Sequence, residues 1–255
     1  MEGQDETTNN KQQTIKTKKG ILSLLLAVMT GLASMQTTSV YAMDSCMGLS
    51  TQSVEAKAYA TSASAIMNFE EEELDLMSCD ELENYIGELH TLSKTTIKSK
   101  KGYTPAQQAW LVAAAIAKKK GYPCVAICIK HSVKNIPVVE TPQSKGVFRK
   151  RIVKTTAYKN YKKKYGKQAS ASSSIAFEKS MNKDLYYSLH NVNIRSTGNK
   201  VAKKWYHTVM ITDTFDFAYD NTYKSLFTSI VNNAGWLFQN TGALHPIGIT
   251  ISFID

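Results

Sequence analysis

One cysteine and two histidines are the residues of this chain best suited to covalent chemistry. The chain has 255 residues, among them four cysteines and five histidines. Cys124 stands at the start of an expected helix, where the positive end of the helix dipole lowers the pKa of a thiol and favours the thiolate. The candidate bases are His207 and His190, which fall on expected strands later in the chain. Cysteine hydrolases use such a pair, because the imidazole takes the proton of the thiol.

The geometry of the two histidines depends on the turn between the strands that carry them. Both segments alternate apolar and polar residues, which is typical of half-buried strands. If Gly198 and Asn199 are the central residues of the turn, His190 lies directly opposite His207, with Cβ atoms about 5 Å apart. Such a pair suits proton transfer or metal binding. The alternative is a pair of core histidines whose ring nitrogens bond to backbone groups.

Two further groups of side chains are of types that bind metals. Cys124, Cys128 and His131 share one helix face by their spacing, and with a later histidine they could bind zinc. The alternative is that both cysteines are small, packed core residues. Three aspartates within residues 213–220 suggest calcium, but they lack the alternating spacing and central glycine of a calcium loop. We therefore expect a strand end and a polar turn there, and we assign no metal site and no cofactor.

The strongest binding signal is the segment of residues 145–167, which has ten basic residues and no acidic one. Its tyrosines are spaced three and four apart, which predicts an aromatic stripe along a lysine-rich helix. Such a helix could hold a polyanion by charge and by stacking. The candidate binding residues are Lys150, Arg151, Lys154, Tyr158, Tyr161, Lys162, Lys163, Lys164 and Tyr165. The alternative is that the tyrosines pack inward and the lysines only keep the protein in solution.

Charge divides the chain into an acidic part and a basic part. Residues 43–93 have eleven acidic residues and one basic residue, whereas residues 94–255 have 26 basic and seven acidic residues, a net charge of +19. We expect residues 43–93 to form an acidic, partly flexible helical prefix and residues 94–255 to form a basic domain. The prefix either masks the basic domain or is a solvated acidic surface that touches nothing basic.

The start of the chain has the three parts of a secretory signal peptide. Three lysines precede an apolar run, residues 20–29, and the small residues Val40 and Ala42 stand at the −3 and −1 positions of a cleavage site. We predict a signal peptide over residues 1–42, and the alternative is an uncleaved membrane anchor. The mature protein would be secreted, and extracellular or associated with the cell wall. All four cysteines follow the predicted cut, so disulfides are possible there with their pairing open.

Periodicity and capping signals predict an α+β fold, with an N-terminal helical segment followed by a mostly antiparallel sheet packed with helices. Capping boxes at Ser78 with Glu81 and at Thr104 with Gln107 mark two helix starts. The expected helices cover residues 70–77, 79–89, 105–119, 124–131 and 221–240. The expected strands cover residues 136–139, 175–177, 186–194, 205–217 and 247–253.

These observations favour a secreted bacterial binding or effector protein that engages an anionic partner. Its partner would be an anionic cell-wall polymer, a membrane surface or another polyanion. The alternative function is an extracellular cysteine hydrolase that acts on cell-wall or protein amide bonds, with Cys124 as nucleophile and His207 or His190 as base.

Overall fold

The computed structural model describes residues 67, 69–93, 98–143, 146–216, 221–230, 237 and 242–255. The predicted signal peptide and its cleavage site lie outside the described residues, as do Cys46 and Asp220. Contacts divide the chain into two compact units, which are residues 1–77 with 88–108 and residues 78–87 with 109–255. Within the described part of the chain, no helix has both the length and the apolar character needed to cross a membrane.

Two of the first three helices in the described part of the chain begin at the capping boxes that the sequence predicts. Ser78 N–H donates to Glu81 Oε2 at 2.8 Å, and Glu81 N–H donates back to Ser78 Oγ at 3.3 Å. Thr104 N–H likewise donates to Gln107 Oε1 at 3.0 Å, and Gln107 N–H donates to Thr104 Oγ1 at 3.2 Å. Both capping boxes are therefore confirmed. The helices are α3 (Glu71–Leu76), α4 (Cys79–Leu92) and α5 (Pro105–Lys119).

The remaining helices lie in the second unit. They are α6 (Pro123–Lys134), α7 (Val147–Ile152), α8 (Thr156–Tyr165), α9 (Lys183–Ser188) and α10 (Asn221–Ile230). The strand predicted from residue 186 is wrong in its first half, because α9 occupies that stretch. Asn182 Oδ1 accepts a hydrogen bond from Leu185 N–H at 3.0 Å, and this cap starts a helix where alternation favoured a strand.

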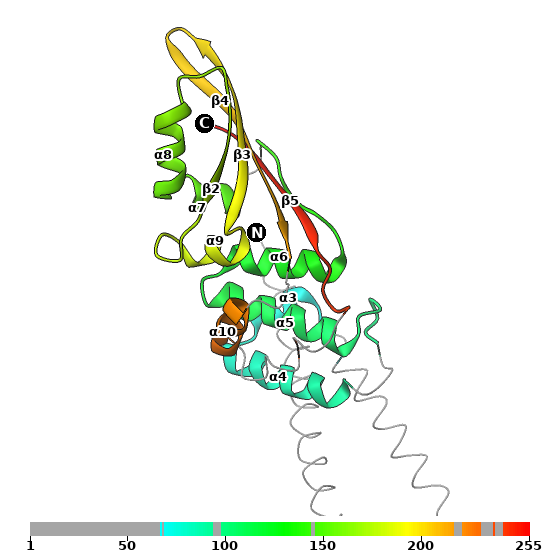
Figure 1. The fold of residues 1–255 in the computed structure, drawn as a ribbon. Helices are drawn as coiled ribbons and strands as arrows, with labels where there is room; N and C mark the ends of the chain where they lie inside the picture. Colours follow the sequence, from blue (N-terminus) through cyan, green and yellow to red (C-terminus); the bar gives the residue numbers. More distant parts are fainter. Residues whose placement is uncertain are drawn as a thin grey trace, which may run out of the picture. The chain divides into compact units, whose positions relative to one another are not determined.

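Five strands form one mixed sheet in the order β1-β5-β4-β3-β2 (Figure 1). Strand β1 runs parallel to β5, and every other neighbouring pair is antiparallel. The α+β fold with a mostly antiparallel sheet is therefore confirmed. The strands are β1 (Val138–Glu140), β2 (Ser170–Ala176), β3 (Asn191–Val201), β4 (Lys204–Phe215) and β5 (Ile247–Ile254).

The hairpin of β3 and β4 turns at Ala202 and Lys203, so the predicted turn at Gly198 is wrong. Both turn residues have positive φ, 45° and 69°, as the two central residues of a type I′ hairpin turn do. Gly198 pairs instead with His207 in the middle of the ladder. A Cβ at residue 198 would lie 2.7 Å from His207 Nδ1 and 2.9 Å from the Gln168 carbonyl oxygen. Glycine is required at position 198 because the His207 ring lies against the backbone of β3 there.

One face of the sheet carries the core of the second unit. Helices α6 to α9 pack on this face, where Phe148, Leu185, Ile211 and Phe253 are buried together. The strands alternate buried and exposed residues, so the opposite face presents side chains such as Met210 to solvent. The hydrophobic effect explains this arrangement, because α6 and α9, together with α7 and α8 of the basic segment, cover the apolar face of the sheet.

Candidate functional site

Cys124 lies at the buried N-terminus of α6, as predicted, but a carboxylate already occupies that helix end. Asp184, on α9, accepts hydrogen bonds from Cys124 N–H and Val125 N–H, both at 3.0 Å. Arg151 Nε forms an ion pair with the same carboxylate at 2.9 Å. The positive end of the α6 dipole is therefore neutralised by Asp184.

This environment disfavours the Cys124 thiolate. Burial raises the pKa of the Cys124 thiol, and the negative charge of the nearby Asp184 carboxylate raises it further. The predicted lowering of this pKa is wrong, because the helix dipole acts on a residue that is fully buried beside a negative charge. Burial also raises the pKa of Asp184, and the two N–H donors and Arg151 oppose that rise.

The two candidate histidines lie in different surroundings. His190 follows α9 with a positive φ of 35°, and its ring packs against Tyr186 at 4.7 Å between centroids. His207 is buried on β4, where its Nε2 lies 3.1 Å from the Gly166 carbonyl oxygen and its ring stacks on Trp205. The β3–β4 register does not oppose them. Among the described residues no hydrogen bond joins Cys124 to either histidine, so the hydrolase hypothesis stays a prediction that this geometry does not favour.

The metal hypotheses gain no support from the described residues. Within them, no three His, Cys, Asp or Glu side chains are grouped so that they could hold a metal ion. His131 Nδ1 lies 2.9 Å from the Pro137 carbonyl oxygen. Asp213 Oδ1 accepts from Thr214 N–H at 2.8 Å, and burial raises the pKa of Asp213 to about 6. The three described cysteines, Cys79, Cys124 and Cys128, are free thiols.

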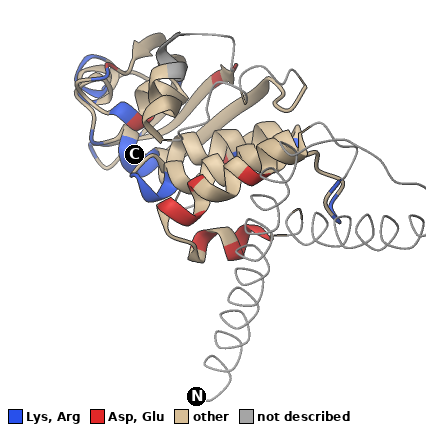
Figure 2. Cartoon of the chain, turned by 90° about the horizontal axis from the view of Figure 1, so that it is seen from below, with Lys and Arg blue, Asp and Glu red and all other residues tan. Residues whose placement is uncertain are grey.

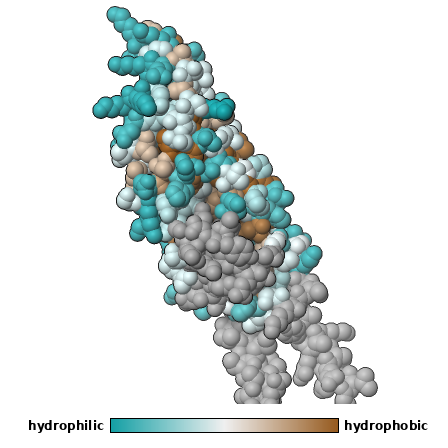
Figure 3. Space-filling view, in the orientation of Figure 1, coloured by the Kyte–Doolittle hydropathy of each residue, from teal (hydrophilic) through white to brown (hydrophobic). Residues whose placement is uncertain are grey.

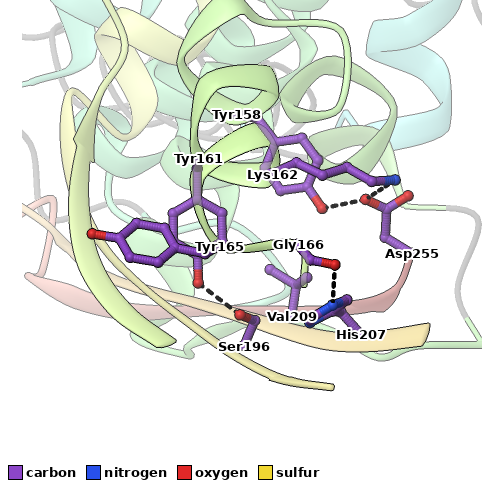
Figure 4. A pocket seen from close by; sticks show the side chains of 9 residues that line it. All are labelled: Tyr158, Tyr161, Lys162, Tyr165, Gly166, Ser196, His207, Val209 and Asp255. Atoms are coloured by element: carbon purple, nitrogen blue, oxygen red, sulfur yellow. Dashed lines mark hydrogen bonds and ion pairs between the residues drawn. The ribbon is translucent and has the colours of Figure 1, made fainter. Parts of the chain in front are cut away.

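The tyrosines of the basic segment point inward rather than outward. Tyr158 and Tyr161 are buried, and Tyr165 packs at the edge of the same core. Together with side chains from β3 and β4 and with Asp255, which follows β5, they line a small pocket (Figure 4). The pocket is lined by Tyr158, Tyr161, Lys162, Tyr165, Gly166, Ser196, His207, Val209 and Asp255. Stacking of a ligand on Tyr158 and Tyr161, which the sequence suggested, is not available in this structure.

Hydrogen bonds across this pocket attach α8 to the sheet. Tyr158 Oη donates to Asp255 Oδ2 at 2.6 Å, and Lys162 Nζ lies 2.9 Å from the same oxygen. Tyr161 Oη is 2.8 Å from Ser196 Oγ. Burial works to raise the pKa of Asp255, but the hydrogen bonds from Tyr158 and Lys162 outweigh it and leave that pKa lowered. These contacts give the pocket residues a structural role.

The basic residues of this segment differ in whether their side chains have partners, and Lys159 and Lys167, which were not among the predicted binding residues, belong to the comparison. Arg151 and Lys162 have carboxylate partners, and Lys164 lies over the Tyr165 ring at 4.9 Å. In a second group the side chains are exposed, and they make no hydrogen bond or ion pair among the described residues. This group comprises Lys150, Lys154, Lys159, Lys163 and Lys167. Lys and Arg gather on helices beside the C-terminus (Figure 2), which Asp255 ties to α8.

Sequence reasoning missed the acidic residues that organise the basic part of the chain. Glu140 accepts from Phe148 N–H at 3.1 Å and from Arg149 N–H at 3.2 Å, and so caps α7 as Asp184 caps α6. Asp255 holds α8 through Tyr158 and Lys162. Their rarity was a usable signal, since only seven acidic residues follow residue 93. When an acidic residue is buried in a protein, its carboxylate is almost always paired, so the few acidic residues in a basic segment are candidates for buried pairs.

No protein-family model matches this chain, and no curated protein or solved structure is significantly similar to it.

Proposed function

We propose that this protein is exported and binds an anionic partner through one face of α8. We define the lysine face as Lys159 and Lys163 of α8 together with Lys167, which lies two residues beyond the last helical residue, Tyr165. Lys159 and Lys163 are four residues apart, which brings them to the same side of the helix. The observation that carries the proposal is that all three are exposed, whereas Tyr158 and Tyr161 on the opposite side are buried.

Charge on this face is not used to stabilise the fold. Lys162 and Arg151 are held by Asp255 and Asp184, but the lysine face has no acidic partner in the described chain. Like charges at a spacing of four repel one another, which destabilises an isolated helix slightly. An anionic partner would relieve that repulsion and release counterions on binding. Hydrophilic side chains project from this region in Figure 3.

The test of binding is a charge-neutralised variant measured on dextran sulfate beads. In the full chain, Lys159→Gln, Lys163→Gln and Lys167→Gln together are expected to weaken retention at least about tenfold near 0.15 M salt. The variant should also flatten the dependence of log affinity on log salt by about three charges, because each neutralised contact releases fewer counterions.

The matched control neutralises three exposed lysines away from α8. Lys118→Gln, Lys119→Gln and Lys134→Gln remove the same total charge from α5 and α6. Retention of this control should stay close to that of the parent. If retention weakens equally in both triple variants, the effect depends on net charge alone and not on the lysine face. If retention weakens in neither variant, the lysine face does not bind the polymer.

Export is tested by the N-terminus of the protein recovered outside a bacterial host. Mass spectrometry should find a chain that starts at Met43, since cleavage is proposed after Ala42. An Ala42→Arg variant should be left unprocessed, because the −1 position requires a small residue. Exported protein that still begins at Met1, or protein that stays entirely inside the cell, would contradict the proposal.

A further inference from the structure

Strand β2 forms one edge of the sheet, and its outward backbone groups are free. β2 pairs only with β3, in an unbroken antiparallel register. Gly198 N–H donates to the Ala169 carbonyl, and Phe177 N–H donates to the His190 carbonyl. Both pairs continue the β2–β3 register, so the odd-numbered residues turn their amide groups toward β3.

The even-numbered residues of β2 therefore present N–H and C=O groups to the outside. These residues are Ser170, Ser172, Ser174 and Ala176. In the described chain, no backbone group other than those of β3 and the residues that continue it is bonded to β2. Ser174 C=O accepts only a long hydrogen bond, 3.3 Å, from Ser173 Oγ, and it keeps a second lone pair.

This edge lacks the features that usually prevent an added strand. Proteins protect an exposed edge with an inward lysine, a proline or a bulge. The seven residues of β2, SASSSIA, contain no charge and no proline, and the register shows no bulge. The side chains are small, so another strand could approach to the usual spacing of about 4.8 Å.

Positive charge stands on both sides of the free edge. On the covered side, Tyr165 packs against the same core as Ala171 and Ile175 of β2, and the Lys164 amino group lies 4.9 Å from the centroid of the Tyr165 ring. The Tyr165 ring extends from α8 toward β2 in Figure 4. On the open side, exposed Arg195 of β3 is the direct neighbour of Ser172. A strand added to β2 would thus meet a cation above and a cation below.

We propose that the edge of β2 takes up an extended, acidic segment of a partner polypeptide as a sixth strand. The free amide groups of β2 would supply the ladder, and Lys164 and Arg195 would select acidic side chains on the two faces of the added strand. This proposal rests on the proposed function, and it names the anionic partner as a polypeptide. A second copy of this chain fits less well, since pairing β2 with β2 would bring two lysine-rich α8 helices together.

The test compares proline with alanine at the outward positions, using the full chain and a labelled peptide. The probe is an acetylated, amidated heptapeptide, Thr-Asp-Val-Glu-Val-Asp-Thr. Ser172→Pro and Ser174→Pro each remove one outward donor, and their ladder bonds to β3 remain because these N–H groups do not face β3. The expected result is about tenfold weaker peptide binding by the double proline variant, while Ser172→Ala with Ser174→Ala binds as the parent does.

A second arm leaves the protein unchanged, in case the proline variants fail to fold. The same peptide with alternate backbone nitrogens methylated keeps its charge but cannot complete a ladder, and we expect it to bind at least about tenfold more weakly. Equal binding of methylated and unmethylated peptide, or no binding of either, would overturn the proposal. The proposal would also be overturned if the parent sediments as a dimer and the double proline variant as a monomer, because a second copy of the chain would then occupy the edge of β2.

The outcome for β2 is separable from the outcome for the lysine face. The proline and alanine pairs are also measured on dextran sulfate, where a polymer without amide groups cannot add a strand. Both pairs of variants could be retained on dextran sulfate like the parent, while the proline pair binds the peptide as tightly as the parent does. That result would exclude the added strand and leave the proposed binding by the lysine face unaffected. If the lysine-face variant loses no retention, the proposed function fails independently of β2.

Discussion

Replacing Asp184 with alanine is expected to lower the free energy of unfolding by about 2–5 kcal/mol. The side chain is 2% exposed and accepts hydrogen bonds from Cys124 N–H and Val125 N–H. Each buried donor left without an acceptor costs about 1–3 kcal/mol. Arg151 would also lose its partner, but its side chain is 31% exposed and water can solvate it. The helix cap is therefore the main loss.

Urea unfolding measures this change, with two variants as controls. Asp184→Asn keeps one acceptor oxygen and should lose less stability than Asp184→Ala. Glu178→Ala changes an exposed acidic residue between β2 and α9, and we expect an effect within about 0.5 kcal/mol. If Asp184→Ala unfolds at the same urea concentration as the parent, α6 does not depend on this cap.

Replacing Glu88 with glutamine is expected to stabilise the protein at pH 8 and to change little at pH 5. Glu88 lies on α4, and its Oε2 is buried without a hydrogen-bond partner in the described residues. Burial raises the pKa of Glu88 from 4.5 to about 7. Between these values the folded protein binds a proton that the unfolded chain has lost, so stability falls as the pH rises through this window. The ionised carboxylate costs about 1–2 kcal/mol above pH 7, after allowance for its partial exposure.

Thermal unfolding of the parent and of Glu88→Gln at pH 5 and pH 8 tests this prediction. The stability difference between the two proteins should appear only at the higher pH, since glutamine stays neutral throughout. Asp80→Asn, at an exposed position on the same helix, serves as the control and should show no such dependence. A parent protein that is more stable at pH 8 than at pH 5, with an unchanged Glu88→Gln profile, would refute the role of Glu88.

Features set by neighbouring residues were predictable from the amino-acid order. The starts of α4 and α5 follow from capping boxes that close within four residues, and they form as expected. The final strand, β5, was predicted because its alternation is strict and one face is buried. The α+β class followed from the same local patterns, since helix and strand periods are readable over a single element.

Features set by distant residues were not predictable in the same way. Gly198 reads as a turn residue, but it is required by the His207 ring and the Gln168 carbonyl, which only the folded hairpin brings together. A shift of the turn by a few residues changed every cross-strand neighbour, and the expected pairing of His190 with His207 disappeared. Cys124 was correctly placed at a helix start, yet Asp184, sixty residues away, decided its electrostatics.

By itself, the amino-acid sequence determined where charge is concentrated, which elements form locally and where a signal peptide is predicted. Only the tertiary structure decided which of the bases are used internally, by Asp184 and Asp255, and which remain on the lysine face. It also decided that the tyrosines serve the core and that β2 has a free edge. The physical reason is that burial and ion pairing depend on contacts between residues far apart in the chain, whereas composition and periodicity do not.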